Sequence, residues 1–426
     1  MRLLAAMLAL LGLALLPVKA LAQDAAIYDA RARQLVTILT APGHETDFFS
    51  TLFLDAVPIE RWRALADDLR RQYGQPVTLG AIQYESKTTA QVEVRYDKAT
   101  VGFTLVVAPQ IPNRVVGLQV VGARQAEDNM DRVMVDIAAL PGHAAFSAAQ
   151  LTDAGPQWVE AFHADDQMAT GSSYKLYILA ELARAVSAGE HRWSDVIPLG
   201  PKSFSGRLAR WPDHTPMTLQ SLASAMIAES DNSAADTLML ALGRKRVDAM
   251  LPRTGHSASD AALPLLTTAE AFALKMPTNA SLRDRYTAGS PDQRRALLQA
   301  QAPQLAAGAI DIGTIAETPT AIDKIEWFAS PRDMTALLDW LRRNGRDALP
   351  IMAINSGIGP ANARRWAWLG YKGGSEPGVI AMNFLARRRD GAWFAVSGSW
   401  NDPAARVDEP RFLALMTRAL NLLAGN

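Results

Sequence analysis

A serine and a lysine three residues apart form the most reactive pattern in this sequence. Ser172 and Lys175 lie in the segment Ser-Ser-Tyr-Lys, directly before the apolar run 176–180, and no other Ser-x-x-Lys occurs in the chain. If a helix begins at Gly171, both side chains project from the same face. A buried lysine loses basicity and can then accept the proton of a neighbouring hydroxyl. The pattern predicts a nucleophilic serine with a lysine partner, although a capping serine and a lysine that extends to the surface would also fit.

Two further polar motifs follow along the chain. Ser230-Asp231-Asn232 ends the predicted helix 219–229, and it offers a hydroxyl for proton relay and an amide for a substrate carbonyl. Lys372-Gly373-Gly374-Ser375 is a glycine-rich strand segment, which permits close approach of the backbone to a ligand. There Lys372 can attract a carboxylate, and the N–H of Ser375 can donate to an oxyanion. Taken singly, these motifs also fit a helix break and an edge strand.

The composition excludes several other chemistries. The 426 residues include no cysteine, which rules out disulfides, thiolate metal sites and cysteine nucleophiles. The 43 basic and 43 acidic residues give no net charge, so there is no electrostatic footprint for nucleic acid. The sequence has no Gly-x-Ser-x-Gly, His-Glu-x-x-His or Walker motif, and its six histidines show no ligand spacing. We therefore expect neither a cofactor nor a metal.

The first 22 residues have the pattern of a secretory leader. Arg2 precedes an apolar run from Leu3 to Leu16, and Ala20-Leu21-Ala22 provides a small-x-small cleavage site. The run is shorter than the about 20 residues that span a membrane. We expect a signal peptide over 1–22, export to the periplasm, and no membrane span after cleavage. An uncleaved anchor is the alternative.

The elements that must position the motifs divide the mature chain into two predicted domains. Residues 23–124 show α+β order, because helical spacing at 25–40 and 59–73 precedes four strand-like runs. Those runs are 77–84, 90–96, 100–107 and 114–122. The polar stretch 125–129 is the predicted linker. Residues 130–426 form the larger domain, which is helical in its middle and ends with strands at 379–386 and 393–399 and a helix at 410–423.

The order of the three motifs is more specific than any one of them. Penicillin-recognising serine enzymes carry Ser-x-x-Lys, Ser-Asp-Asn and Lys-Thr-Gly in this order. The interval of 58 positions from Ser172 to Ser230 resembles the class A β-lactamase spacing, and segments 230–236 and 266–268 also resemble class A sequences. The 142 residues from Ser230 to Lys372 predict an insertion, and Gly373 departs from the family's threonine.

A narrower resemblance covers the whole mature chain. Segments 267–272, 325–330 and 371–378 are similar to two-domain serine hydrolases related to one encoded in clavulanic-acid gene clusters. That group joins a small N-terminal α+β domain, of the cystatin or nuclear-transport-factor-like kind, to a β-lactamase/transpeptidase-like domain. The resemblance implies the α+β class for this chain, with helices flanking an antiparallel sheet in the larger domain.

The resemblance also implies catalytic roles. Ser172 would attack an acyl carbonyl to form an acyl-enzyme, and Lys175 would activate it. Ser230 would pass the proton to the departing nitrogen or oxygen. Lys372 would neutralise a substrate carboxylate and assist Ser230.

Substrate binding would fall to three further positions. Asn232 would hold Lys175 and the substrate amide. Gly374 and Ser375 would bring the backbone against the substrate, and the N–H groups of Ser172 and Ser375 would form the oxyanion hole.

One part of the class A pattern is absent. Those enzymes activate the deacylating water with a glutamate just before the Thr-Thr segment. This chain has no glutamate between Asp231 and Ala269, and Glu270 falls on the next predicted helix. His256 and Asp260 are the remaining acid–base candidates in that loop, where a surface histidine and a turn cap are the simpler interpretations. We expect complete acylation chemistry and slow deacylation.

The function expected is that of an exported serine hydrolase acting on a β-lactam, ester or related amide. Its substrate would be a small-molecule or peptidoglycan-like anionic acyl compound. The alternatives are a D-alanyl-D-alanine peptidase and a penicillin-binding or sensing module without turnover. Trp366 and Trp368 either line a substrate cleft or pack in the core, and residues 387–389 either form a solvated hairpin or supply an arginine for a carboxylate. The sequence does not indicate an oligomeric state.

Overall fold

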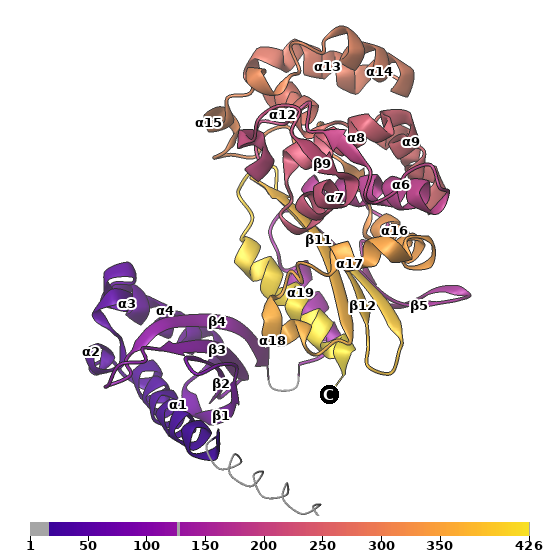
Figure 1. The fold of residues 1–426 in the computed structure, drawn as a ribbon. Helices are drawn as coiled ribbons and strands as arrows, with labels where there is room; N and C mark the ends of the chain where they lie inside the picture. Colours follow the sequence, from indigo (N-terminus) through magenta and orange to yellow (C-terminus); the bar gives the residue numbers. More distant parts are fainter. Residues whose placement is uncertain (1–16, 126–127, 426) are drawn as a thin grey trace, which may run out of the picture. The chain divides into compact units, whose positions relative to one another are not determined.

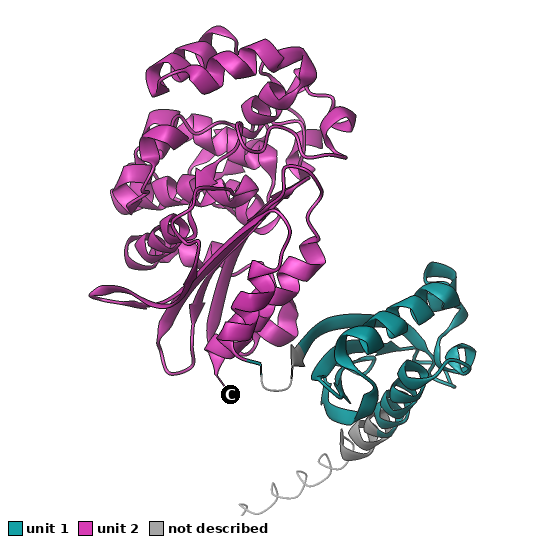
Figure 2. Cartoon of the chain, turned by 180° about the vertical axis from the view of Figure 1, so that it is seen from behind, with its two compact units in different colours: residues 1–128 teal, residues 129–426 magenta. Residues whose placement is uncertain are grey.

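The structure of the protein is a computed structural model that describes residues 17–125 and 128–425 (Figure 1). The chain forms two compact units, Met1–Asp128 and Asn129–Asn426 (Figure 2). Residues 1–16 of the expected signal peptide lie outside the described residues, and the first described helix begins at Pro17, before the predicted start at residue 25. Within the described chain, no helix has both the length and the apolar character needed to cross a membrane.

The first unit packs helices on one face of a four-stranded antiparallel meander in the order β1-β2-β3-β4. Side chains of β3 alternate between buried and half-exposed, as expected for a sheet covered on one face. The predicted helices and strands are confirmed, although α1 begins eight residues before its predicted start and other ends shift by up to about three residues, and α2 and α3 are additional. The elements are α1 (Pro17–Thr40), α2 (Glu45–Phe48), α3 (Thr51–Ala56), α4 (Ile59–Tyr73), β1 (Pro76–Tyr84), β2 (Thr89–Tyr96), β3 (Ala99–Val107) and β4 (Val115–Gln125).

The second unit is built on a five-stranded antiparallel sheet in the order β11-β12-β13-β5-β6. Helices α5 and α19 pack on one face, and α6 and α16 pack on the other. Because both faces are covered, the central strands β12 and β13 are buried almost throughout. The strands are β5 (His143–Thr152), β6 (Gly155–Phe162), β7 (Met168–Ala169), β8 (Val196–Pro198), β9 (Pro216–Thr218), β10 (Phe328–Ala329), β11 (Trp368–Glu376), β12 (Val379–Arg387) and β13 (Trp393–Asn401).

Helices fill most of the interval between β6 and β11, whereas α5 precedes β5 and α19 follows β13. They are α5 (Met130–Ala138), α6 (Lys175–Ser187), α7 (Leu219–Ala228), α8 (Asn232–Leu242), α9 (Arg244–Asp248), α10 (Met250–Thr254), α11 (Ser259–Ala262), α12 (Thr268–Lys275), α13 (Ala280–Ala288), α14 (Pro291–Ala300), α15 (Ile312–Ile315), α16 (Pro331–Asn344), α17 (Leu349–Met352), α18 (Gly359–Ala363) and α19 (Glu409–Ala424). Short 3₁₀ turns are η1 (Gly171–Tyr174), η2 (Arg207–Arg210), η3 (Pro277–Asn279), η4 (Ala307–Ala309) and η5 (Arg346–Ala348). Helix α6 lies at the centre of the large core, so the lysine at its start is buried.

Candidate active site

The Ser-x-x-Lys motif forms the tight turn η1 at the start of α6. Thr170 anchors the turn, since its hydroxyl donates to the carbonyl oxygen of Trp327 at 2.6 Å. Gly171 has φ of +49°, a left-handed conformation that favours glycine. Ser172 is half-buried, whereas the next residue, Ser173, is fully buried and accepts a hydrogen bond from Asn383 Nδ2 at 2.9 Å. The turn therefore keeps Ser172 accessible and fixes the residue beside it.

Lys175 connects this turn to the Ser-Asp-Asn motif. Its ammonium donates to the Ser230 carbonyl oxygen at 2.6 Å and to Asn232 Oδ1 at 2.6 Å, and it lies 3.4 Å from Ser230 Oγ. The side chain is fully buried. Burial lowers the pKa of Lys175 to about 7, against the opposing effect of Asp236 and Asp231. A substantial fraction of the amine is therefore neutral near pH 7 and able to accept a proton.

Ser230 lies between the two motif lysines. Its φ of +57° is unusual for a residue other than glycine, and it places the residue at the break between α7 and α8. Lys372 Nζ donates to Ser230 Oγ at 2.9 Å and also to the Gly373 carbonyl oxygen. Burial, and then the nearby charge of Lys175, lower the pKa of Lys372 well below its ordinary value. The hydroxyl of Ser230 is thus in reach of both amines, as a proton relay requires.

Hydrogen bonds to α8 and to the segment 205–208 hold the Ser-Asp-Asn motif in place. Asp231 caps α8 by accepting from the Ala234 N–H at 2.9 Å, and it also accepts from the Leu208 N–H at 2.8 Å. The amide of Asn232 is oriented from both ends, since its oxygen accepts from Lys175 and its nitrogen donates to Ser205 Oγ at 2.7 Å. The predicted helix break is therefore a fixed turn.

Glycine allows β11 to approach the nucleophile turn closely. A Cβ added at Gly374 would clash with the Ser172 nitrogen and the Thr170 oxygen, and one added at Gly171 would lie 3.2 Å from the Ser375 nitrogen. These contacts bring the backbone of Ser172 beside that of Ser375. The two N–H groups predicted as oxyanion donors therefore come from adjacent segments.

The departure from Lys-Thr-Gly at Gly373 has a steric reason. A Cβ at this position would overlap the ring and hydroxyl of Tyr371, which lies two residues earlier on the same face of β11, and would lie 2.9 Å from the Ala381 carbonyl oxygen. A threonine cannot occupy position 373 while Tyr371 keeps this rotamer.

A buried cluster of Glu326, Lys275 and Glu376 supports the same two segments, and sequence reasoning assigned it no role. Lys275 Nζ donates to Glu326 Oε1 at 2.8 Å and also contacts Glu376, the residue after Ser375. The other Glu326 oxygen accepts from the Gly171 N–H at 3.1 Å. We call this group the Glu326–Lys275–Glu376 cluster.

The protons of this cluster are unevenly shared. Burial and then the Glu326 charge raise the pKa of Glu376 well above its ordinary value. Burial opposes ionisation of Glu326 and Lys275 as well, but their mutual attraction outweighs it, so the pKa of Glu326 falls and that of Lys275 rises. These three pKa shifts agree with a charged Glu326–Lys275 pair beside a protonated Glu376.

The residues considered for deacylation are engaged elsewhere or exposed. The interpretation of His256 as a surface histidine is wrong: it is buried because its loop folds against β10 and α16. Its Nδ1 accepts from the Ala258 N–H at 3.1 Å, and its Nε2 is 3.0 Å from the Phe328 carbonyl oxygen. Asp260 is exposed on α11. Glu270 lies on α12, as predicted, where it pairs with Arg244.

The tryptophans before the third motif pack in the core. Trp366 is buried beside Phe394, and Trp368 lies 5.4 Å from Trp393 between ring centroids. The cleft-lining alternative is not supported, because Trp368 pairs with Arg387 at the end of β11 that is opposite to Ser375.

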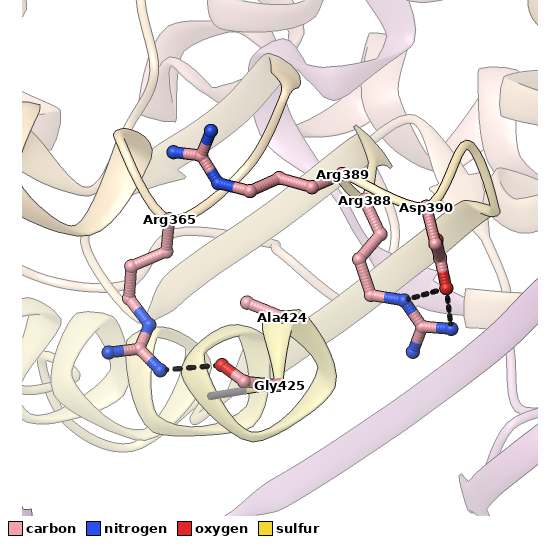
Figure 3. Close-up of a pocket in the computed structure, with 6 residues that line it drawn as sticks. All are labelled: Arg365, Arg388, Arg389, Asp390, Ala424 and Gly425. Atoms are coloured by element: carbon pink, nitrogen blue, oxygen red, sulfur yellow. Dashed lines mark hydrogen bonds and ion pairs between the residues drawn. The ribbon is translucent and has the colours of Figure 1, made fainter.

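The arginines of the β12–β13 hairpin lie at that same remote end. A surface pocket of about 480 Å³ is lined there by Arg365, Arg388, Arg389, Asp390, Ala424 and Gly425 (Figure 3). Arg388 pairs with Asp390, and Arg389 donates to the Arg364 carbonyl oxygen at 2.6 Å. These contacts support the interpretation of residues 387–389 as a solvated hairpin. They do not support the alternative in which one of these arginines binds a substrate carboxylate beside Lys372.

Comparison with known proteins identifies the class to which this fold and site belong. Residues 126–349, more than half of the chain, match Beta-lactamase2, the beta-lactamase enzyme family. The chain belongs to this family, and its larger unit has a β-lactamase and penicillin-binding-protein-like serine hydrolase fold.

Several solved structures are similar to the chain. A beta-lactamase from Sphaerobacter thermophilus has 18% identity and a TM-score of 0.48, over 70% of this chain and 98% of that one. PBP-A has 15% identity and a TM-score of 0.46, over 69% of this chain and 93% of that one. A beta-lactamase from Chitinophaga pinensis has 16% identity and a TM-score of 0.45, over 70% and 98%. No curated protein matches the chain.

Proposed function

We propose that this protein is an exported, periplasmic serine hydrolase that forms an acyl-enzyme at Ser172 with a β-lactam, an ester or a related amide and releases it slowly. The observation that carries the proposal is the convergence on Ser230 of two buried lysines from different motifs. We further propose that the chain is related to the two-domain hydrolases of clavulanic-acid gene clusters, with a cystatin or nuclear-transport-factor-like first domain.

Acylation begins with proton transfer from the Ser172 hydroxyl to the neutral amine of Lys175. The serine oxygen then attacks the acyl carbonyl, and the negative charge that develops on the carbonyl oxygen is stabilised by the N–H groups of Ser172 and Ser375. Ser230 donates its hydroxyl proton to the departing nitrogen or oxygen, and the protonated Lys175, 3.4 Å from Ser230 Oγ, replaces that proton and returns to the neutral amine. An anionic substrate favours the charged form of Lys372, which offsets the cost of its burial.

The Glu326–Lys275–Glu376 cluster positions the oxyanion donors. Glu326 accepts from the N–H of the residue before Ser172, and Glu376 directly follows Ser375. One lysine holds both carboxyl groups. Because both oxygens of Glu326 are engaged by Lys275 and backbone N–H groups, this carboxylate supports the donors and does not activate water.

Slow deacylation follows from the state of the remaining acid–base groups. Asp236, whose pKa burial raises to about 6, accepts from the N–H groups of Thr268 and Ala269 at 2.7 and 3.0 Å. His256 and Glu270 are held by the contacts described above. No carboxylate is therefore assigned to the deacylating water, which also favours the alternative of a penicillin-binding module without turnover.

Rapid mixing with a chromogenic cephalosporin tests the proposed function. We expect a burst of ring opening of one equivalent per chain, followed by a slow steady rate. A penicillin turnover above about 100 s⁻¹, in the usual range for enzymes, would contradict slow deacylation. A burst with no steady rate would favour the binding module, and rapid cleavage of D-alanyl-D-alanine peptides would favour the peptidase.

A further inference from the structure

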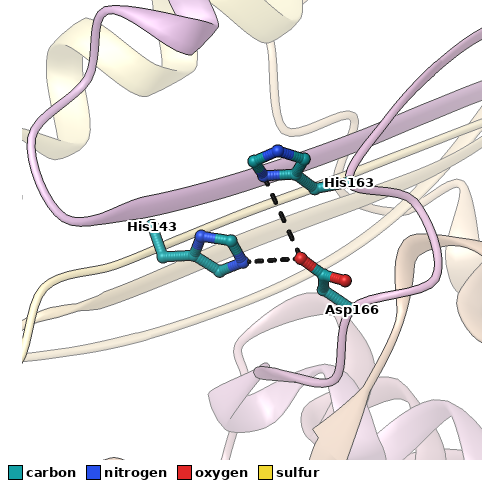
Figure 4. A group of neighbouring side chains, drawn as sticks. All are labelled: His143, His163 and Asp166. Atoms are coloured by element: carbon teal, nitrogen blue, oxygen red, sulfur yellow. Dashed lines mark hydrogen bonds and ion pairs between the residues drawn. The ribbon is translucent and has the colours of Figure 1, made fainter.

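Two of the six histidines and one aspartate meet at one end of the five-stranded sheet (Figure 4). His143 begins β5, His163 directly follows β6, and Asp166 lies three residues further on. The histidines show no ligand spacing in the sequence. The fold nevertheless brings these two imidazoles together, because β5 pairs with β6.

The distances between the ligand atoms suit a small metal ion. Asp166 Oδ2 lies 2.9 Å from His143 Nε2 and 4.0 Å from His163 Nδ1. The three ligand atoms all lie within 4.8 Å of one another. Zinc binds nitrogen and oxygen at about 2.0–2.2 Å, so two of its tetrahedral ligands are about 3.4 Å apart. The two measured distances bracket this value, and small side-chain rotations would complete the geometry.

The surroundings leave the group accessible and orient it. Relative exposures of the three side chains are 46%, 49% and 50%, so an ion can enter and retain water ligands. The His163 ring stacks on Phe162 at 4.2 Å and faces the His143 ring at 5.1 Å. The adjacent Asp165 is paired with Arg332 at 3.3 Å, so the arginine charge next to the group is offset.

We propose that His143, His163 and Asp166 form a binding site for one divalent transition-metal ion, with zinc as the representative ion. Two imidazoles and one carboxylate favour zinc, cobalt, nickel or copper over magnesium and calcium, which prefer oxygen ligands. Asp166 lies six residues before Ser172. A bound ion would therefore join the start of β5 to the segment that leads to the nucleophile turn.

Metal titration of the purified, untagged chain tests this proposal. We expect one equivalent of zinc by isothermal titration calorimetry and one equivalent of cobalt by visible absorption, with no binding of magnesium. Because the ion would bind the folded chain, zinc should also raise the melting temperature.

The variants H143A, H163A and D166N should each weaken zinc binding at least tenfold. H191A is the matched control, since His191 is also partly exposed beside an aspartate, at 3.7 Å from Asp195, but contacts no second histidine among the described residues. Melting in the presence of a chelator checks that the variants remain folded. The absence of saturable zinc binding, or zinc affinity in H143A and H163A equal to that of the unmodified chain, would overturn the proposal and leave only the His143–Asp166 hydrogen bond.

Discussion

At the residue scale, the chemistry depends on how burial changes two lysines. Lys175 and Lys372 are surrounded by protein, and their pKa values fall because the charged amine loses its hydration. The two buried amines also need hydrogen-bond acceptors. Ser230, Asn232 and nearby carbonyl oxygens supply them. In the proposed mechanism, the motifs therefore supply a base and the partners that keep it in position.

The pH dependence of acylation reports the state of Lys175. Its pKa falls from 10.5 to about 7, and the neutral amine is the active form. We expect the single-turnover acylation rate to rise as pH increases through about 7 and then to level off. The measurement is acylation rate against pH with an uncharged ester, which avoids titration of the substrate. A rate that stays constant from pH 5.5 to 8.5 would exclude Lys175 as the base.

The site residues divide into those that sequence can predict and those that it cannot. Ser172, Lys175 and Ser230 stand in local motifs whose residue types imply chemistry. Lys275 meets its carboxylates across 51 and 101 residues, so no local spacing indicates the contact. The burial of His256 also depends on distant residues in β10 and α16, which explains why the surface interpretation failed.

At the element scale, the positions of the two proposed oxyanion donors depend on how three segments meet. Helix α12 ends at Lys275, β11 ends at Glu376, and Glu326 precedes β10. The Glu326–Lys275–Glu376 cluster joins these segments in a dry environment, where a buried charge without its partner is costly. The arrangement of these elements, more than any single motif, therefore determines the positions of the two proposed donors, the N–H groups of Ser172 and Ser375.

Glu326→Gln tests this positioning role. The substitution keeps the size of the side chain and removes the charge opposite Lys275. We expect acylation to slow about 10- to 100-fold with little change in initial substrate affinity, because the oxyanion exists only after attack begins. Single-turnover kinetics separate the two quantities.

Glu270→Gln is the control for this experiment, since Glu270 is another partly buried carboxylate paired with a cation. Both variants should lose some thermal stability, and only Glu326→Gln should slow acylation. Equal acylation by Glu326→Gln and the unmodified chain would show that the cluster serves stability alone.

Prediction of the elements succeeded where periodicity was clear. The helices of the first unit have one apolar face, and β12 and β13 are long apolar runs between turn residues. Strand β5 did not stand out, because it is rich in alanine and buried on both faces, so it shows no alternation. The four-residue helix α2 is too short to create a period.

At the scale of the whole molecule, charge neutrality conceals a local asymmetry. The chain has equal numbers of acidic and basic residues, yet two lysines share one serine in the site. Under the proposed function, an anionic substrate would favour the charged forms of these two lysines without an overall positive field on the protein. The composition alone therefore could not indicate the substrate.

The proposed function depends above all on covalent acylation of Ser172. Intact mass spectrometry after incubation with a penicillin and a cephalosporin measures this directly, with the unmodified chain beside Ser172→Ala. We predict one adduct per chain with the mass of the intact β-lactam, present in the unmodified protein, decaying slowly, and absent from Ser172→Ala. An adduct of equal yield in Ser172→Ala, or no adduct and no ester cleavage in the unmodified protein, would contradict the account.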